Sequence, residues 1–434
     1  MRIDGATIFC LRIPFVEAFR HSTSARSFSD SIVLRVTAED GTVGYGEGVA
    51  RPYVTGETVG SMVSHIVNRL WPTVARVDYN EMFQSQDPLS ALFSINESLP
   101  ELRGDGVIAW HGARTAIELA VIDCLLRSKG LSLGKILPAK RPSVTYSGVI
   151  TAGSVEAAVR HARYFKLFGL KDLKIKIDRV NPVERVAAIR HAVGSEISLR
   201  VDANGAYDAG TAARILSALH DFGVDVAEQP IGRCHPKELA RLRVSSPIPI
   251  MADESLVTLE DARALIDAHA CDYFNLRVSK CGGIIRTLQM AALANSAGVR
   301  LQLGSHVGET AILSAAGRQV AAYLEHVDFV EGSYGNLLLA EDISRDGVVF
   351  GHGGVAPLLL GPGLGIKVRE EVLRNYAQNI ISLSSPARLA HFRKGEVKNV
   401  STNQKGHQLA GKTRASDARA GGNVARKCST TFLA

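Results

Sequence analysis

The sequence contains no apolar stretch long enough to cross a membrane. No segment reaches the roughly 18 uninterrupted apolar residues of a transmembrane helix. The first residues, MRIDGATIFCLRIPF, include Asp4 and Arg12 and lack the apolar core of about 7–15 residues that defines a signal peptide. These absences predict a cytoplasmic protein with no membrane contact.

Cysteine patterns typical of disulfide frameworks and zinc sites are also missing. The six cysteines are scattered and form no C-x-x-C pair: Cys10, Cys124, Cys234, Cys271, Cys281 and Cys428. Small disulfide-linked domains and structural zinc sites both need regularly spaced cysteines. We therefore predict neither.

The net charge of +7 is confined to the C-terminal end of the chain. From Ala387 onward there are ten Lys and Arg residues against Glu396 and Asp417, so the preceding part holds 40 basic and 41 acidic residues. The basic end is rich in Gly, Ser and Thr and poor in aromatic residues, which is typical of a disordered appendage. We interpret residues 369–434 as a disordered tail and predict no nucleic-acid partner. A contact between this tail and nucleic acid or an acidic surface is the alternative.

The chain as a whole is 46% hydrophobic and can bury a large core, and it shows a repeat of about 26 residues. Short β-branched runs alternate with amphipathic stretches from about Val144. Candidate strands lie at 144–151, 173–177, 197–204, 226–230, 248–255, 273–280, 300–306 and 328–332, and candidate helices include 182–193, 211–222, 258–269 and 286–298. This alternation predicts parallel strands joined by right-handed crossovers, and eight strands fit a (β/α)8-type barrel better than an open sheet.

One ionisable residue stands near the end of each strand from the second onward. The series has spacings of 26, 26, 25, 27, 26 and 25 residues and consists of Lys176, Asp202, Glu228, Asp253, Lys280, His306 and Glu331. The carboxyl ends of barrel strands form the active-site face, so these groups should converge on one cavity. Lys174 shares a strand face with Lys176, because side chains alternate with period two. A single Asp at a strand end is usually a cap or turn residue, but seven residues in phase indicate a site.

Three consecutive strands supply carboxylates, namely Asp202, Glu228 and Asp253. Hard oxygen ligands of this kind suit Mg2+, with Mn2+ as the alternative occupant. A structural ion-pair cluster is the competing interpretation, because lysines lie on the flanking strands. Three packed carboxylates repel one another unless a cation is present, which favours the metal.

Lysines stand on both sides of these acids: Lys174 and Lys176 before them and Lys280 after them. A lysine beside another cation in a dry site has its pKa lowered toward the range of a general base. A metal holding a substrate carboxylate would stabilise the enediolate formed when the α-proton leaves. The predicted reaction is therefore proton abstraction α to a carboxylate, with a base on each face.

Five motifs, taken in order, resemble the enolase superfamily and, within it, the muconate lactonizing enzyme subgroup. They are K-I-K (174–176), D-A-N (202–204), E-Q-P (228–230), A-D-E-S (252–255) and S-K-C-G-G (279–283). The resemblance covers about residues 1–368. It implies a (β/α)7β TIM-type barrel at 129–332, an α+β capping domain built from 1–128, and a C-terminal return to the cap at 333–368. It also implies a homo-oligomer.

The resemblance implies a role for each site residue. Lys176 and Lys280 would be the opposed acid/base pair, while Lys174 would lower the pKa of Lys176 and contact the substrate carboxylate. The magnesium ligands would be Asp202, Glu228 and Asp253, supported by Asn204 and Glu254. Cap loops around 16–26 and 51–57 would select the substrate.

Two positions depart from the family patterns. His306 in G-S-H-V-G-E is similar to the catalytic histidine of the mandelate racemase subgroup, but Arg277 stands where that histidine's aspartate partner is expected. His306 is therefore either a substrate contact or a packed residue. Glu331 in E-G-S-Y-G-N resembles the strand-8 glutamate of cycloisomerases and replaces the D-x-D of dipeptide epimerases, which counts against dipeptide epimerisation.

The sequence thus predicts a magnesium-dependent isomerase (racemase, epimerase or cycloisomerase) acting on a small-molecule carboxylate through an enediolate. A lyase of the dehydratase or o-succinylbenzoate synthase type could use the same two lysines. A non-catalytic barrel that binds a ligand is the alternative from another class.

Overall fold

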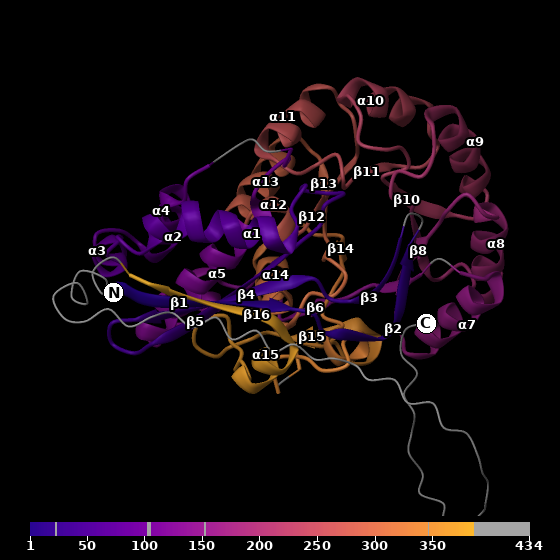
Figure 1. Cartoon of the computed structure of the whole chain (residues 1–434). Helices are drawn as coiled ribbons and strands as arrows, with labels where there is room; N and C mark the ends of the chain where they lie inside the picture. The colour runs from indigo at the N-terminus through magenta and orange to yellow at the C-terminus, as the bar shows by residue number, and fades with distance from the viewer. Residues whose placement is uncertain (22–23, 102–105, 152, 346, 386–434) are drawn as a thin grey trace, which may run out of the picture.

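The computed structural model describes residues 1–21, 24–101, 106–151, 153–345 and 347–385. Figure 1 shows a barrel with helices around its outside, next to a cap built on a separate sheet. Among the described residues, no helix is long and apolar enough to cross a membrane. Most of the predicted basic tail, residues 386–434, lies outside the described residues, so its predicted disorder stays a prediction there.

The barrel is a parallel sheet of eight strands that are neighbours in chain order. Its strands are β7 (Gly148–Ile150), β8 (Asp172–Lys176), β9 (Ser198–Asp202), β10 (Val224–Glu228), β11 (Ile250–Ala252), β12 (Tyr273–Leu276), β13 (Arg300–Leu303) and β14 (Phe329–Val330). The ring closes where the backbone N–H of Ser147, just before β7, donates to the carbonyl of Val330 at 2.8 Å. The predicted TIM-type barrel with a cap is confirmed.

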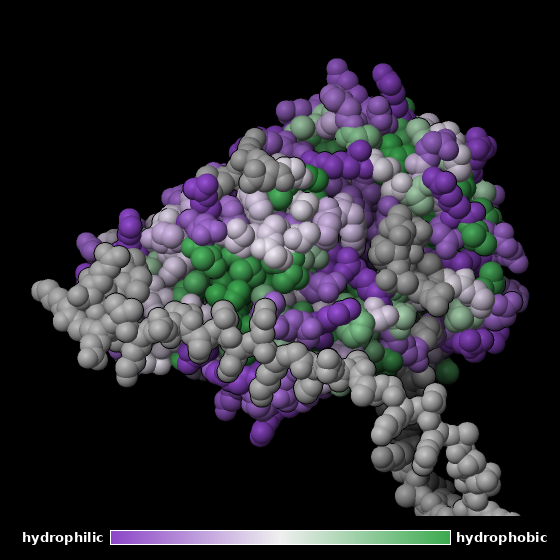
Figure 2. Space-filling view, in the orientation of Figure 1, coloured by the Kyte–Doolittle hydropathy of each residue, from purple (hydrophilic) through white to green (hydrophobic). Residues whose placement is uncertain are grey.

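Helices cover the outside of the strands, as Figure 1 shows for α7 to α11. They are α7 (Val155–Leu167), α8 (Pro182–Val193), α9 (Ala209–His220), α10 (Pro236–Ser245), α11 (Leu259–Asp267), α12 (Val278–Cys281), α13 (Ile284–Ser296) and α14 (Ala311–Tyr323). On α8, Val186, Ile189 and Val193 recur at three- and four-residue spacing and are fully buried. Figure 2 shows mostly hydrophilic residues along the outer edge of the barrel at α9 to α11, where these helices face solvent.

The cap is a four-stranded antiparallel sheet with the order β16-β1-β4-β5, plus a hairpin and helices. The sheet contains β1 (Ile3–Leu11), β4 (Ser31–Ala38), β5 (Val43–Val49) and β16 (Ala377–Ser384), and the hairpin contains β2 (Pro14–His21) and β3 (Ser24–Phe28). The helical elements are α1 (Val59–His65), η1 (Ile66–Leu70), α2 (Trp71–Val74), α3 (Tyr79–Gln84), α4 (Pro88–Ser98), α5 (His111–Ser128) and α6 (Leu133–Ile136).

Helix α5 joins the cap to the barrel and is buried from His111 to Leu126. The alternating glycines of V-G-Y-G-E-G in β5 allow this helix to lie directly on the strand. A Cβ added at Gly46 would meet the carbonyl oxygen of Ala116 at 2.0 Å, and one at Gly48 would meet that of Gly112 at the same distance. Any side chain at these positions would therefore push α5 away from β5.

The C-terminal return differs from its predicted boundary. Beyond η2 (Gly335–Leu337), η3 (His352–Gly354) and β15 (Val355–Pro357), which pairs with β6 (Ser143–Thr145), the chain forms α15 (Glu370–Tyr376) and then β16. Strand β16 pairs along β1, with Ile380 opposite Phe9. The prediction of a disordered tail from residue 369 is therefore wrong up to Ser385. Half-exposed edge strands carry a weak apolar signal, which is why the sequence pattern missed this one.

Two predicted strands are interrupted. The run 144–151 divides into β6 and β7, which belong to different sheets. The run 273–280 ends as a strand at Leu276, and Val278–Cys281 form the short helix α12. Lys280 therefore projects from a helical turn after the strand, not from the strand itself.

Candidate active site

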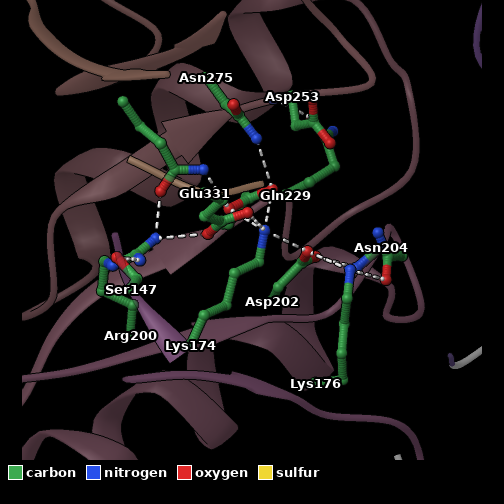
Figure 3. Close-up of polar contacts among 12 residues, drawn as sticks. Ser147, Lys174, Lys176, Arg200, Asp202, Asn204, Gln229, Asp253, Asn275 and Glu331 are labelled. Atoms are coloured by element: carbon green, nitrogen blue, oxygen red, sulfur yellow. Dashed lines mark hydrogen bonds and ion pairs between the residues drawn. The ribbon is translucent and has the colours of Figure 1, made fainter. Parts of the chain in front are cut away.

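Strand register places the first three charged residues of the repeat in one row. Lys176 pairs with Asp202 across β8 and β9, and Asp202 pairs with Glu228 across β9 and β10. Asp253 and Glu331 each follow the last residue of their own strand. All five side chains are buried, with Lys176 and Glu331 the most exposed at 7% and 8%. The predicted convergence on one face of the barrel is what the structure shows for these residues (Figure 3).

Lys174 lies at the centre of the cluster (Figure 3). Its Nζ is 3.0 Å from Asp202 Oδ2, 2.8 Å from Glu228 Oε2 and 3.0 Å from Glu331 Oε2. These carboxylates raise the pKa of Lys174, even though burial by itself would lower it. Because three acids surround it, Lys174 itself stays protonated; the lowering of a lysine pKa beside a second cation and a metal stays a prediction. Lys174 is a fixed cation that holds the acids together.

Lys176 lies one step further toward the cavity. Its Nζ donates to Asp202 Oδ2 at 2.5 Å and to Asn204 Oδ1 at 3.0 Å. Asn204 in turn donates from Nδ2 to Glu254 Oε1 at 3.0 Å, so the two predicted supporting residues form one chain with the acids. Asn204 has a left-handed backbone with φ of 46°, a region that asparagine tolerates better than most residues.

Lys280 holds the other end of the row of acids. Its Nζ is 2.7 Å from Asp253 Oδ1, and it also donates to the carbonyls of Asp253 and Asn275 at 2.8 and 2.7 Å. The side chain is fully buried and, unlike that of Arg277, is not among the residues that line the pocket. Lys176 and Lys280 therefore bracket the acids, one at Asp202 and one at Asp253.

Arg277 is a member of the site that the repeat did not identify. Its guanidinium contacts a carboxylate oxygen of Asp253 and lies 3.5 Å from Glu228 Oε1 and 3.5 Å from His306 Nδ1. An arginine in this position cannot orient a basic histidine as an aspartate would. It instead supplies a second fixed cation between two of the acids.

His306 is a neutral hydrogen-bond donor facing the cavity. Burial and the neighbouring Arg277 hold its pKa well below the ordinary value. Because Nδ1 faces an arginine N–H, Nδ1 accepts and Nε2 carries the proton. That Nε2 is buried and has no hydrogen-bond partner among the described residues, and His306 lines the cavity. The donor is thus free for an acceptor atom of a ligand.

Glu228 collects donors from several strands. Asn275 Nδ2 donates to its Oε1 at 2.8 Å and Gln302 Nε2 to its Oε2 at 3.1 Å. Burial, with Asp202 adding to it, raises the pKa of Glu228 to about 7. Both donors project inward from the following strands, β12 and β13, so the barrel interior is filled with polar groups at this level.

Arg200 supports the far side of the cluster and was also missed (Figure 3). Its Nη1 is 3.0 Å from Glu331 Oε1, and its Nη2 is 2.7 Å from Asp172 Oδ1 and 2.9 Å from Ser147 Oγ. It precedes Asp202 by two residues and so shares its strand face. Applying the period-two argument to every strand, and not to Lys174 alone, would have found it. Glu331 is accordingly held between Arg200 and Lys174.

The acids form a set of oxygen donors of the kind that magnesium prefers. Among the described residues, no three acidic, histidine or cysteine side chains form a ready-made metal site, because lysine and arginine cations contact the carboxylates. Two acceptors beside the acids, Glu254 Oε2 and Asn275 Oδ1, are buried without a donor. Burial and the charge of Asp253 raise the pKa of Glu254 to about 7. The donor set therefore fits a hard cation that shares or displaces the present ion pairs.

A pocket with about 830 Å3 of empty space, part of which is open solvent, is lined by residues of the cluster. Its polar wall includes Lys174, Lys176, Arg277, His306 and Glu331. Its apolar wall includes Phe19, Tyr53, Val149, Tyr334 and Leu338. The two predicted cap loops each contribute one residue, Phe19 from β2 and Tyr53 from the segment after β5. A pocket that combines a polar and an apolar wall is typical of small-molecule sites.

Known proteins of similar sequence and fold match most of this chain. An N-succinyl-L-Arg/Lys racemase from Bacillus cereus is 28% identical over 86% of this chain and 97% of its own. Its crystal structure superposes with a TM-score of 0.79 over 88% of this chain and 100% of that one, at 26% identity. Muconate cycloisomerase 1 from Rhodococcus opacus is 27% identical over 85% of this chain and 96% of its own.

A dipeptide epimerase from Cytophaga hutchinsonii, solved with Mg and the dipeptide D-Ala-L-Val, has a TM-score of 0.78 over 88% of this chain and 100% of that one. At 24% identity it shows the fold alone.

The capped barrel and its buried lysine–carboxylate row define a barrel enzyme whose site lies at the carboxyl ends of the strands. The model of the "Enolase C-terminal domain-like" family matches residues 156–372, which is half of the chain. The protein belongs to this family, within the enolase superfamily. Two relatives described above are named for racemisation and cycloisomerisation, which confirms the prediction of an isomerase of this superfamily.

Proposed function

We propose that this protein is a magnesium-dependent isomerase with two opposed lysines. One lysine removes the α-proton of a small carboxylate, and the other returns a proton to the opposite face of the same carbon. The observation that carries the proposal is the bracketed row: Lys176 bound to Asp202 at one end and Lys280 bound to Asp253 at the other. A structural ion-pair cluster would not need a pocket lined by its own charged side chains, as Lys174, Lys176 and Glu331 line this one. Racemisation or epimerisation uses this arrangement most directly.

The proton transfer needs one lysine as a neutral amine and the other as an ammonium. In one direction, the amine of Lys176 takes the α-proton and the C–H electron pair moves into the carboxylate, giving an enediolate. The ammonium of Lys280 then returns a proton to the opposite face of the α-carbon. The reverse reaction exchanges the two roles, so each enantiomer is deprotonated by a different lysine.

Each lysine is paired with a carboxylate that also contacts a second cation. Asp202 contacts both Lys174 and Lys176, so Lys174 remains as a cation on that carboxylate when Lys176 changes its protonation. Asp253 contacts both Lys280 and Arg277 in the same way. Arg277 lines the pocket and Lys280 does not, so Lys280 must gain access to the pocket for it to reach a substrate.

Asp202, Glu228 and Asp253 would hold the magnesium ion, supported by Asn204 and Glu254. A bound divalent ion would supply Lewis acidity at the substrate carboxylate and so favour loss of the α-proton. Lys174 lies against two of these acids and would add a second positive charge near the same carboxylate.

The cavity indicates the rest of the substrate. The neutral Nε2–H of His306 would donate to a carbonyl or carboxylate oxygen beyond the reacting carbon. Phe19, Val149 and Leu338 offer apolar contact on the cap side. These features suit an acylated amino acid or a dicarboxylate, classes suggested by the names of the racemase and the cycloisomerase among its relatives. The homo-oligomer and the cytoplasmic location stay predictions.

Proton exchange in heavy water tests the proposal. Wild-type protein with Mg2+ is incubated in D2O with N-succinyl amino acids, dipeptides and muconate, and α-deuterium is followed by NMR. We expect deuterium in both recovered substrate and product for at least one compound. Lys176→Ala should abolish exchange from one enantiomer, and Lys171→Ala, an exposed lysine just before β8, is the control. A wild-type protein that binds Mg2+ but exchanges no compound would contradict the proposal.

A further inference from the structure

The short helix α12, which carries Lys280, is held by the cap. Thr115 Oγ1 in α5 lies 3.4 Å from the carbonyl of Val278, and Glu118 accepts from the backbone N–H of Ile284 at 2.6 Å. From β5, the N–H of Val49 donates to Ser279 Oγ at 3.1 Å. Cap residues therefore contact the segment on both sides of Lys280.

The two glycines after Lys280 make this close contact possible. Both have left-handed backbones, with φ of 92° at Gly282 and 117° at Gly283. A Cβ at Gly282 would meet the His111 ring at 2.9 Å, and one at Gly283 would meet Glu118 Oε2 at 1.8 Å. Helix α5 thus packs directly against the backbone that follows the lysine.

His111, the first residue of α5, binds the backbone of Lys280 itself. Its Nδ1 is 2.6 Å from the Lys280 carbonyl oxygen, and both groups are buried. A carbonyl only accepts, so Nδ1 carries the proton. Nε2 then accepts from Arg286 Nη1 at 3.3 Å. Both ring nitrogens are satisfied only by the neutral imidazole in this tautomer.

A chain of polar contacts fixes that tautomer from outside. Arg286 Nη1 is 2.6 Å from Glu101 Oε1, whose side chain is 55% exposed. Burial and the charge of Arg286 lower the pKa of His111 to about 4, which keeps the ring neutral at working pH. The contacts run from Glu101 through Arg286 and His111 to the backbone of Lys280, and none of these three residues lines the main cavity.

We propose that His111 is a positioning residue. Its Nδ1–H donates to the carbonyl of Lys280 and so fixes the position of Lys280 relative to the acids. The proposal rests on the proposed function, because it matters only if Lys280 transfers a proton. Lys280 donates three hydrogen bonds at fixed distances, so a shift of its backbone would take Nζ off Asp253. Lys176, on β8, takes no part in the row of contacts from Glu101 to Lys280, so its position should be unaffected.

Two substitutions separate the positioning role from simple packing. His111→Asn places an amide N–H near the position of Nδ1, so it keeps the donor to Lys280 and loses the contact with Arg286. His111→Gln places its amide near the position of Nε2, so it keeps the contact with Arg286 and loses the donor to Lys280. His220→Gln, at an exposed position in α9, is the control for the chemical change.

The assay measures α-proton exchange in D2O separately from the two enantiomers of whichever N-succinyl amino acid or dipeptide the wild type exchanges fastest. Lys280→Ala first identifies the enantiomer that depends on Lys280. Since a misplacement of about 1 Å can cost on the order of 10²-fold, we expect His111→Gln to lose at least about tenfold for that enantiomer and less than about threefold for the other. His111→Asn should stay within about threefold of wild type for both.

Each other outcome has a distinct meaning. Equal losses for both enantiomers in His111→Gln, or equal behaviour of the Asn and Gln variants, would overturn the positioning role. If Lys280→Ala leaves exchange of both enantiomers intact, the proposed function has failed instead. A crystal structure of His111→Gln needs no substrate: Lys280 Nζ should leave Asp253, and an unchanged position would also overturn the inference.

Discussion

Replacing Lys174 with methionine tests whether the charges of the site depend on one central cation. Lys174 is 2% exposed and its Nζ lies within 3.0 Å of oxygens from Asp202, Glu228 and Glu331. Methionine keeps most of the volume of the side chain and removes the charge. The variant therefore leaves three buried carboxylates facing one another without the ion between them.

The expected loss follows from this burial. Removing one partner of a buried ion pair costs about 3–5 kcal/mol because the remaining charge is uncompensated. Glu331 keeps Arg200 and Glu228 keeps its amide donors, which argues for the lower end of that range. Burial raises the pKa of Glu228 and Lys174 lowers it. Loss of Lys174 therefore raises this pKa further, and protonation of Glu228 would relieve more of the cost the lower the pH. The measurement is therefore made at pH 8.

Urea unfolding followed by tryptophan fluorescence gives the free energy of unfolding. We expect Lys174→Met to lose about 3 kcal/mol relative to wild type at pH 8, and less at pH 6. Lys171→Met removes an exposed lysine close to the same strand and should change stability by less than about 0.5 kcal/mol. A loss below about 1 kcal/mol in Lys174→Met at pH 8 would refute the view that Lys174 holds the acids together.

Three further substitutions test a metal ligand, the carboxylate that caps α5, and the close packing of α5 against the backbone after Lys280. Asp202→Asn should abolish the Mg2+ binding that calorimetry detects in wild type, and retained binding would remove Asp202 from the ligand set. Burial raises the pKa of Glu57, which caps α5, from 4.5 to about 7. The stability that its protonated form contributes is therefore complete below about pH 4.5 and lost as pH rises through about 7. Glu57→Gln should flatten that fall in the free energy of unfolding, and an unchanged slope would count against it. Gly283→Ala should destabilise by on the order of 1–3 kcal/mol, because its Cβ would lie 1.8 Å from Glu118 Oε2; wild-type stability would show that α5 can move.

The repeat predicted what depends on chain order. A row of residues spaced by about one β-α unit lands on neighbouring strand ends, so Asp202 and Glu228 could be placed side by side before the fold was known. Helix α8 also has the predicted bounds, because its apolar spacing, Pro182 and Gly194 mark both ends.

What the sequence could not predict depends on contacts between distant segments. Arg277 was noticed only for the aspartate it replaces, and its contact with Asp253 depends on how the strands close into a ring. The raised pKa of Lys174 depends on three acids meeting at one nitrogen. His111 gave no signal, because its partner lies 169 residues further along the chain.

The central claim is that Lys176 and Lys280 serve opposite faces of one carbon. The direct measurement is α-deuterium exchange from each enantiomer of one substrate, comparing Lys176→Ala with Lys280→Ala. We predict that each variant still exchanges one enantiomer, that the retained enantiomers are opposite, and that neither variant interconverts them. If both variants lose the same enantiomer, or if either still racemises the substrate, the two-lysine account is contradicted.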